Sequence, residues 1–218
     1  MQKALIFANG EPNDGAMVQR ALRAANGATI IAADGGARVA RFYGFVPHVV
    51  IGDMDSLPEP ELEKLIAGGA LALRHPVDKD ATDLELCLQY AATNGARWIR
   101  VIGGIGGRFD QVMANTLLMT LDALDHCDAE LVAGQQAIRI LKPGSHRIEG
   151  AAGDTLSLIP IAGDVHEVHT QALRYPLRGE TLHFGLARGV SNVMQESAAV
   201  VTFAAGMLLL VHFVGRAE

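Results

Sequence analysis

Cysteine is scarce in this chain of 218 residues, and the two cysteines that occur, Cys87 and Cys127, stand far apart. They lack the spacing of a metal-ligand set, and both fall in stretches of helical character. We therefore expect two reduced, buried thiols, as in an intracellular protein.

Long apolar runs are also missing. The run from Ala4 to Ala8 is too short for the core of a secretory signal peptide and ends at Asn9. The C-terminal run Met207–Val214 is interrupted by His212 and is far shorter than a membrane span. The sequence predicts a cytoplasmic protein without a membrane partner.

An excess of positive charge is the third absence. The formal net charge is −6, so the totals indicate no nucleic-acid partner. Half of the residues are hydrophobic and 19% are charged, which excludes wholesale disorder and allows a sizeable core. An acidic balance still permits nucleotide binding, because a bound cation can invert the local field.

In the first part of the chain, short apolar runs alternate regularly with stretches of helical periodicity, which is the pattern of parallel βα units. Thr82 and Glu85 form a capping-box pattern at the start of one helix. We expect an α/β domain with a mostly parallel sheet over residues 1–134. Its predicted strands are Lys3–Ala8, Ala28–Ala33, His48–Ile51, Leu71–His75, Trp98–Ile102 and Glu130–Val132, and its predicted helices are Gly15–Ala25, Ala37–Tyr43, Glu61–Ile66, Asp83–Thr93 and Gln111–Asp125.

The period changes after Gly134. Short alternating segments separated by Gly, Asp and Pro predict a smaller, all-β, sandwich-like domain over residues 135–218, with a partly open barrel as the alternative. A unit of this size is near the lower limit for an independent core, so we expect it to pack on the first domain or on a second subunit. Examples of the alternating segments are Ala137–Leu141, Thr155–Ile161, Asp164–His169, Ala199–Phe203 and Leu208–Phe213.

Aspartates are concentrated where two predicted strands end. Asp53 and Asp55 follow the third strand, and Asp78, Asp80 and Asp83 follow the fourth. Open α/β sheets bind ligands at this carboxyl edge. In an extended Asp-x-Asp stretch both side chains point the same way, and neighbouring carboxylates repel unless a cation lies between them. We predict that these five aspartates form a metal site.

The composition of the two clusters favours Mg²⁺. Neither contains the Cys or His that zinc requires. An EF-hand loop would need an oxygen ligand and a glycine where Leu57 and Pro58 stand. Oxygen ligands shared with phosphates are typical of Mg²⁺. Thr82 and Asp83 also have a structural explanation, since they can serve as N-cap and first-turn acid of a helix.

Four glycines and an arginine follow the fifth predicted strand, in Gly103-Gly104-Ile105-Gly106-Gly107-Arg108. Glycines let a backbone approach a ligand, and the helix after them offers free N–H groups to an anion. Arg108 could bind a phosphate through two hydrogen bonds. Neither the Walker nor the dinucleotide pattern is met, so tight-turn chemistry and phosphate binding both stay open for these glycines. A similar loop follows the second predicted strand, where Asp34 stands beside Gly35 and Gly36.

Five segments together resemble the thiamine pyrophosphokinase (thiamine diphosphokinase) family. No single segment is specific, but they occur in the family's order and span most of the chain. They are Ala33-Asp34-Gly35-Gly36-Ala37, Gly52-Asp53-Met54-Asp55-Ser56, Asp78-Lys79-Asp80-Ala81-Thr82-Asp83, Gly106-Gly107-Arg108-Phe109-Asp110 and Gly189-Val190-Ser191-Asn192.

The resemblance implies an α/β catalytic domain that binds ATP and Mg²⁺, a β domain that contributes to thiamine binding, and a homodimer with active sites between subunits. The implied reaction transfers an intact diphosphate from ATP to the thiamine hydroxyl and releases AMP. Our own mechanistic hypothesis is that Asp80 or Asp83 accepts the hydroxyl proton. The implied residues are Asp53, Asp55, Asp78, Asp80 and Asp83 for the metal; Asp34, Asp78, Thr82, Arg108, Asp110 and Asn115 for the nucleotide; Asp55, Asp80, Asp83 and Arg108 for catalysis; and Ser191 and Asn192 for thiamine.

Two positions depart from the family's pattern. Gln111 follows Asp110 where the family commonly has histidine, and Ala172 stands where glycine is expected. Ser191-Asn192 is also typical of a turn between strands.

Other functions fit parts of the sequence. The stretch Val50–Leu57 resembles the hydrophobic-D-x-D loop of haloacid-dehalogenase-type phosphatases, but Gly52 intervenes and the loop follows the third strand. A sugar-nucleotide transferase would leave the second aspartate cluster without a role. A pyrophosphokinase for another alcohol, such as a pterin, would keep the chemistry. A non-catalytic nucleotide-binding module would bind Mg²⁺-ATP without turnover.

Overall fold

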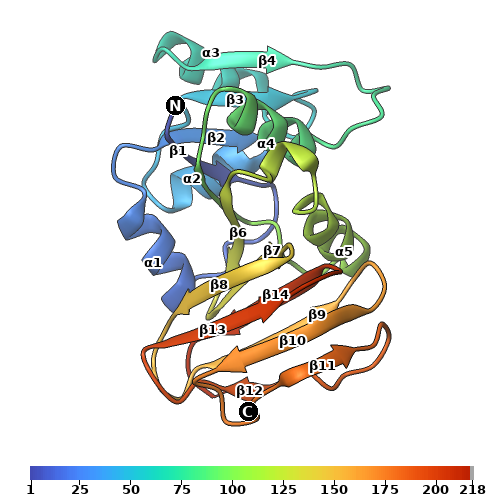
Figure 1. Ribbon diagram of the computed structural model, residues 1–218. Helices are drawn as coiled ribbons and strands as arrows, with labels where there is room; N and C mark the ends of the chain where they lie inside the picture. Colours follow the sequence, from blue (N-terminus) through green and yellow to red (C-terminus); the bar gives the residue numbers. More distant parts are fainter. Residues whose placement is uncertain (217–218) are drawn as a thin grey trace. The chain divides into compact units, whose positions relative to one another are not determined.

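The computed structural model describes residues 1–216, and the chain divides into two compact units (Figure 1). The first unit is Met1–Gly134, and the second begins at Gln135. Each has its own arrangement of strands and its own buried core.

The first unit alternates strands and helices, and every strand and helix predicted for this part of the chain is present. The elements are β1 (Lys3–Phe7), α1 (Ala16–Ala24), β2 (Thr29–Ala33), α2 (Gly36–Phe42), β3 (Val49–Gly52), α3 (Glu59–Ala67), β4 (Leu71–Arg74), α4 (Asp83–Thr93), β5 (Trp98–Ile102), α5 (Phe109–Leu118), the 3₁₀ turn η1 (Asp122–Leu124) and β6 (Asp128–Ala133).

Two helices differ from expectation by two residues or more at one or both ends, while α1 and α2 agree to within one residue. The helix predicted over Gln111–Asp125 is wrong in extent, because α5 begins at Phe109, ends at Leu118 and is followed by the separate turn η1. Helix α3 begins at Glu59, since a proline in the first turn sacrifices no intrahelical hydrogen bond. Within residues 1–216, no helix is long and apolar enough to cross a membrane.

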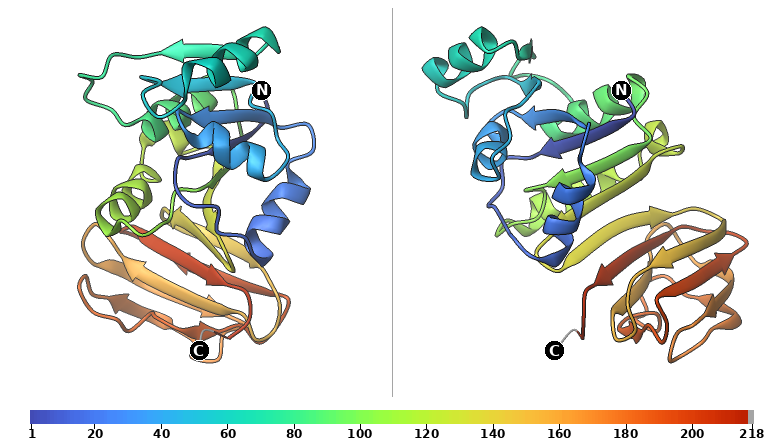
Figure 2. Two further views of the ribbon diagram at one scale, coloured as in Figure 1. Left: turned by 180° about the vertical axis from the view of Figure 1, so that it is seen from behind. Right: turned by 90° about the vertical axis from the view of Figure 1, so that its left-hand side faces the viewer.

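The sheet of the first unit has the strand order β6-β5-β1-β2-β3-β4, and all neighbouring strands are parallel. The chain moves in one direction from β1 to β4 and then returns to the other side of β1 for β5 and β6. Right-handed crossovers therefore place α1, α2 and α3 on one face and α4 and α5 on the other. Figure 2 shows the twisted sheet with its covering helices. The strand order reverses between β1 and β5, where such sheets bind their ligands.

Burial on both faces explains why the parallel strands read as continuous apolar runs. In β1, Ala4 through Phe7 are each 0% exposed. The helix signal at Thr82 is confirmed, because its Oγ1 accepts a hydrogen bond from the Glu85 amide at 3.2 Å. Both cysteines are free, but only Cys87 is buried; Cys127 is partly exposed, so the expectation of two buried thiols is wrong for that residue.

Over its described residues, 135–216, the second unit consists of strands and the turns and loops between them. They form two antiparallel sheets with the orders β12-β9-β14-β7 and β11-β10-β13-β8. One buried cluster draws apolar side chains from both sheets, which makes the unit a sandwich and confirms the predicted fold class. The strands are β7 (Gln136–Leu141), β8 (Gly144–Glu149), β9 (Thr155–Pro160), β10 (Val165–Gln171), β11 (Arg178–Leu182), β12 (Asn192–Val193), β13 (Ala198–Phe203) and β14 (Leu208–Phe213).

Three of these strands are not among the examples named from the sequence, and all three lie at sheet edges. Strand β8 has one buried residue, Ile148, and β11 also has one, Leu182. Strand β12 is two residues long. Edge strands carry polar side chains that discourage pairing with other chains, so they lack the apolar alternation that reveals an inner strand.

Candidate functional site

A cavity of about 810 Å³ opens at the carboxyl edge of the first unit's sheet. Its walls come from the loops after β1, β2, β3 and β5, from α2, from the start of α4 and from α5. This is where the strand order reverses, so the topology explains its position. Among the lining residues are seven of the predicted site residues: Asp34, Asp53, Asp55, Thr82, Asp83, Arg108 and Asn115.

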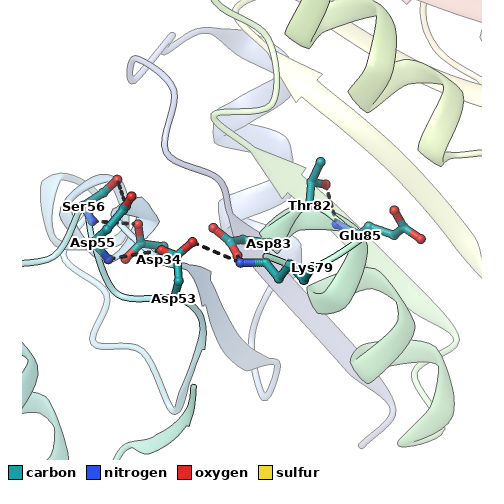
Figure 3. Close-up of polar contacts among 8 residues, drawn as sticks. All are labelled: Asp34, Asp53, Asp55, Ser56, Lys79, Thr82, Asp83 and Glu85. Carbon is teal, nitrogen blue, oxygen red and sulfur yellow. Dashed lines mark hydrogen bonds and ion pairs between the residues drawn. The ribbon is translucent and has the colours of Figure 1, made fainter. Parts of the chain in front are cut away.

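Three carboxylates meet inside this cavity (Figure 3). One oxygen each of Asp34, Asp53 and Asp83 lies within 4.8 Å of the others. The Oδ1 atoms of Asp34 and Asp83 are buried and accept no hydrogen bond, although Asp83 Oδ1 lies 2.8 Å from the Lys79 ammonium group. Buried carboxylate oxygens without a donor are costly, and a cation with oxygen ligands would satisfy them. These three residues, called the carboxylate cluster below, therefore fit a divalent cation such as Mg²⁺.

Asp34 is the most enclosed member of the carboxylate cluster, with 2% exposure. Burial raises the pKa of its carboxyl, against the hydrogen bonds from Ser56 and Gly35, and the charge of Asp83 raises it further. The Ser56 amide donates to Oδ2 at 3.0 Å. The sequence indicated Asp34 only as a nucleotide contact, whereas the structure places it beside the other two carboxylates.

Gly52 makes the close approach of these aspartates possible. A Cβ atom at this position would lie 2.9 Å from the Asp34 Cβ and 3.0 Å from the Asp83 Cγ. Its φ of +153° is also one that other residues rarely adopt. The glycine that separates this loop from the phosphatase pattern is therefore a requirement of the carboxylate cluster.

The segment from Asp53 to Asp55 is a turn, so the premise of an extended Asp-x-Asp stretch is wrong. Met54 has a φ of +67° and packs into the core with 6% exposure. The Asp55 amide donates to Asp53 Oδ1 at 3.2 Å. Burial of Met54 separates the two acids: Asp53 enters the carboxylate cluster, while Asp55 is exposed on the cavity wall, where its carboxylate accepts a hydrogen bond from Ser56 Oγ at 2.9 Å.

The second acidic segment turns a lysine inward and its neighbouring aspartates outward. Asp78 and Asp80 are exposed, and neither is among the residues described as lining the cavity. Between them, Lys79 places its Nζ 3.2 Å from Asp53 Oδ2 and 2.8 Å from Asp83 Oδ1. The structure thus does not gather the five predicted aspartates: it joins Asp53 and Asp83 to Asp34.

Lys79 was missed by sequence reasoning, although a lone base inside an acidic run is a usable signal. Burial would lower the pKa of Lys79, but its contacts with the negatively charged carboxylates of Asp83 and Asp53 outweigh this effect, so the pKa of Lys79 lies above its usual value. The pKa of Asp53 is lowered by the hydrogen bond from the Asp55 amide and by Lys79.

The glycines of the loop after β5 have different surroundings: two are crowded by neighbouring atoms and two face open space. Gly103 has a φ of +80°, and a Cβ there would lie 2.5 Å from the Ala8 carbonyl oxygen; at Gly104 it would lie 2.9 Å from Leu131 Cδ2. Gly103 is therefore required where it meets the backbone at Ala8, and Gly104 leaves room for the Leu131 side chain; both also line the cavity. A Cβ at Gly106 or Gly107 would meet nothing within 4 Å, and both residues line the cavity, so they leave space for a ligand.

Arg108 lines the cavity and is held by a neighbour. Its Nε donates to Asp110 Oδ1 at 3.2 Å, and its Nη2 donates to Asp110 Oδ2. The pairing raises the pKa of Arg108 and lowers that of Asp110. Asp110 is not among the described lining residues, whereas Gln111 is. On the same helix, Asn115 Nδ2 donates to the Gly104 carbonyl at 2.8 Å and fixes the loop.

The predicted thiamine residues lie in the second unit. Asn192 is 8% exposed, and its side chain holds Tyr175, accepting from its amide at 3.0 Å and donating to its carbonyl at 2.7 Å. Ser191 is exposed with a φ of +60°. Ala172 has a φ of +57°, which explains why glycine is expected there.

Comparisons with known proteins agree over both units. The family model described as "Thiamin pyrophosphokinase, catalytic domain" matches residues 22–129, and "Thiamin pyrophosphokinase, vitamin B1 binding domain" matches residues 145–208. A thiamine pyrophosphokinase of Bacillus subtilis is 28% identical over 170 residues, covering 78% of this chain and 79% of that protein. Thiamine pyrophosphokinase 1 of rice (Oryza sativa subsp. japonica) is 30% identical over 169 residues, but the chain spans only 63% of its length.

Solved structures give the same result. The crystal structure of thiamine pyrophosphokinase from Bacillus subtilis superposes with a TM-score of 0.86 at 26% identity, covering 98% of this chain and 99% of that one. The yeast thiamin pyrophosphokinase superposes with a TM-score of 0.79 over 97% of this chain and 86% of its own; at 15% identity it supports the fold alone.

Proposed function

Since the chain belongs to the thiamine pyrophosphokinase family, we propose that it transfers a diphosphate group from ATP to the hydroxyl of thiamine, giving thiamine diphosphate and AMP. The observation that carries this proposal is the carboxylate cluster, which lies in a cavity at the ligand-binding edge of the catalytic unit. The first unit would bind ATP and the second would contribute to thiamine binding.

The carboxylate cluster is the proposed site of Mg²⁺. Asp34, Asp53 and Asp83 would supply its oxygen ligands, with Asp55 close by on the cavity wall. When bound, the ion would offset the negative charge of the phosphates. Asp78 and Asp80, unlike Asp55, are not among the described residues that line the cavity, so they would have no ligand role.

The phosphates of ATP would lie along Gly106 and Gly107. Open space beside these glycines and the free N–H groups of the first turn of α5 favour an anion there. Arg108 would bind the phosphates, and Asp110 would orient its guanidinium. Thr82 lies on the cavity wall, where it would contact the nucleotide, while its Oγ1 caps α4.

In the chemical step, the thiamine hydroxyl oxygen forms a bond to the β-phosphorus. The bond from that phosphorus to the oxygen bridging the α- and β-phosphates breaks, and AMP leaves with the bridging oxygen and its electron pair. The hydroxyl proton passes to a carboxylate. Asp83 is preferred over Asp80, because Asp83 lines the cavity. Positioning and electrostatics would supply most of the rate.

For thiamine, the second unit offers an exposed Ser191 and an exposed Tyr175 side chain. Asn192 would act by holding the Tyr175 segment, since its amide group is already engaged there. Ser191 would be free to contact the vitamin directly.

A homodimer is also proposed. Phe109, Met113 and Leu117 lie one helical turn apart on α5 and are 75%, 45% and 47% exposed. An apolar stripe of this kind is typical of a surface that packs against a partner. We further propose a cytoplasmic location, supported by the two free thiols.

The test is to incubate the protein with Mg²⁺-ATP and thiamine and to quantify AMP and thiamine diphosphate. We expect equal amounts of the two products and no AMP when thiamine is omitted. Formation of ADP or free phosphate in place of AMP would contradict diphosphate transfer. A pterin alcohol in place of thiamine tests the choice of acceptor.

A further inference from the structure

Lys79 supplies a positive charge inside the carboxylate cluster. Its Nζ contacts Asp83 at 2.8 Å and Asp53 at 3.2 Å, and its side chain is only 14% exposed. Figure 3 shows the amino group between these two carboxylates. The lysine therefore contacts two of the three groups that the proposed function assigns to the metal.

The ammonium group satisfies the carboxylate cluster incompletely. Asp34 Oδ1 is buried without a hydrogen-bond donor. The contact from Lys79 to Asp83 Oδ1 is a close ion pair, but it lacks the geometry of a hydrogen bond. One positive charge thus faces three carboxylates. A divalent cation can bind oxygens from all three at once, which a single ammonium group at this position does not do.

The position of Lys79 in the chain allows it to leave. It lies in the irregular segment between β4 and α4, where its amide donates to the Val77 carbonyl at 3.0 Å. The exposed residues Asp78 and Asp80 flank it. Movement of this side chain would break no strand ladder and no helical hydrogen bond.

We propose that Lys79 is a resident counter-ion of the metal site, which holds Asp53 and Asp83 in place without metal and leaves them when a divalent cation binds. The proposal rests on the metal site of the proposed function. Its physical reason is that an ammonium group and a divalent ion repel each other and require the same two carboxylates.

Two measurements on the full chain test this role. The first is calorimetric titration with MgCl₂, without ATP or thiamine, of the wild type, Lys79→Met and Lys64→Met. Lys64 is an exposed lysine of α3 and controls for the loss of one charge. We expect Lys79→Met to bind Mg²⁺ about tenfold more tightly than the wild type, since the competing cation is gone, and Lys64→Met to match the wild type. Lys79→Gln replaces Lys79→Met if the latter does not fold.

The second measurement separates displacement from a lysine that stays beside the ion. The wild type is labelled with an amine-reactive ester, with and without Mg²⁺ at a concentration that saturates the calorimetric signal, and modified lysines are identified by mass spectrometry. We expect Mg²⁺ to raise the labelling of Lys79 several-fold and to leave Lys64 unchanged, because only Lys79 would exchange an ion pair for solvent.

Equal or weaker Mg²⁺ binding by Lys79→Met would overturn the proposal. So would unchanged labelling of Lys79 in the saturated wild type, or the absence of Mg²⁺ binding in both proteins. The diphosphate-transfer proposal has its own readout, the formation of AMP and thiamine diphosphate. If Mg²⁺ displaces Lys79 but no thiamine diphosphate forms, the counter-ion proposal stands and the diphosphate-transfer proposal fails. If the reaction proceeds but Mg²⁺ leaves Lys79 undisturbed, the outcome is the reverse.

Discussion

A hydrogen bond of 2.8 Å joins His212 Nε2 to Asp154 Oδ2, and both side chains are 7% exposed. The Asp154 carboxylate also accepts from the Gly215 amide at 2.8 Å and the Ala151 amide at 2.9 Å. This buried pair joins the end of β14 to the turn before β9. Burial opposes the charge of Asp154, but the hydrogen bonds from Gly215, His212 and Ala151 outweigh it and lower its pKa.

Acid should weaken the second unit through Asp154. Because its folded pKa lies below the unfolded value, its stabilising effect is complete above the unfolded pKa and is lost as the pH falls through the folded pKa. The stabilisation by Asp154 should therefore be lost below about pH 4. Asp154→Asn should reduce this acid sensitivity and lower the free energy of unfolding at pH 7 by about 1–3 kcal/mol. Urea unfolding across this range measures both effects. Glu63→Gln, which removes an exposed acid from α3, is the control, and equal acid profiles for both variants would contradict the assignment.

Gly52→Ala should both strain the backbone and displace two aspartates of the carboxylate cluster. The new Cβ would press on Asp34 and Asp83, so we expect weaker Mg²⁺ binding and a loss of unfolding free energy of about 1–2 kcal/mol. Gly69→Ala is the matched control: Gly69 also has a positive φ, +95°, but a Cβ there would meet nothing within 4 Å. Urea unfolding and Mg²⁺ titration of both variants would isolate the contact with the aspartates. Equal losses of Mg²⁺ affinity would argue against it.

Asp83 and Asp80 offer a comparison within one segment. Asp83→Asn should lower kcat/KM by about 100-fold or more, since it removes a charge from the proposed metal site. Asp80→Asn should keep near-normal turnover, because Asp80 is exposed outside the cavity lining. Thiamine-dependent AMP formation at varied ATP measures both. A severe loss in Asp80→Asn with full activity in Asp83→Asn would reverse the assignment.

Arg108→Met should lower kcat/KM for ATP by about 10–100-fold, because a charge on the proposed phosphate path is lost. Asp110→Asn should cost less, since Arg108 would remain while losing only its orienting partner. Initial rates at varied ATP give the comparison. Indistinguishable kinetics for Arg108→Met and the wild type would remove Arg108 from the site.

Leu117→Glu should shift the proposed dimer toward monomer, because it places a charge in the apolar stripe of α5. Ala114→Glu adds the same charge at an exposed position of α5 outside the stripe and should leave association unchanged. Sedimentation velocity at several protein concentrations measures the result. A monomeric wild type would refute the dimer, and an unaffected Leu117→Glu would place its interface elsewhere.

Local order in the sequence determined much of the molecule. Apolar runs and helical periods predicted the elements of the first unit, and the change of period after Gly134 predicted that the second unit is built from strands alone. Aspartates placed directly after strands indicated the sheet edge where the cavity lies, because the carboxyl ends of parallel strands share one edge. These inferences succeed because periodicity and strand direction depend on neighbouring residues.

Tertiary structure alone decided which side chains meet. Because Met54 is buried, the side chain of Asp53 points toward the carboxylate cluster and that of Asp55 lies on the cavity wall. In the next acidic segment, Lys79 contacts the cluster, whereas Asp78 and Asp80 are exposed. Asp34 arrives from a different loop. The sequence by itself therefore determined the kind of site and its edge of the sheet. The choice among the aspartates, and the lysine between two of them, depends on backbone turns and on contacts between loops distant in the chain, which no local pattern specifies.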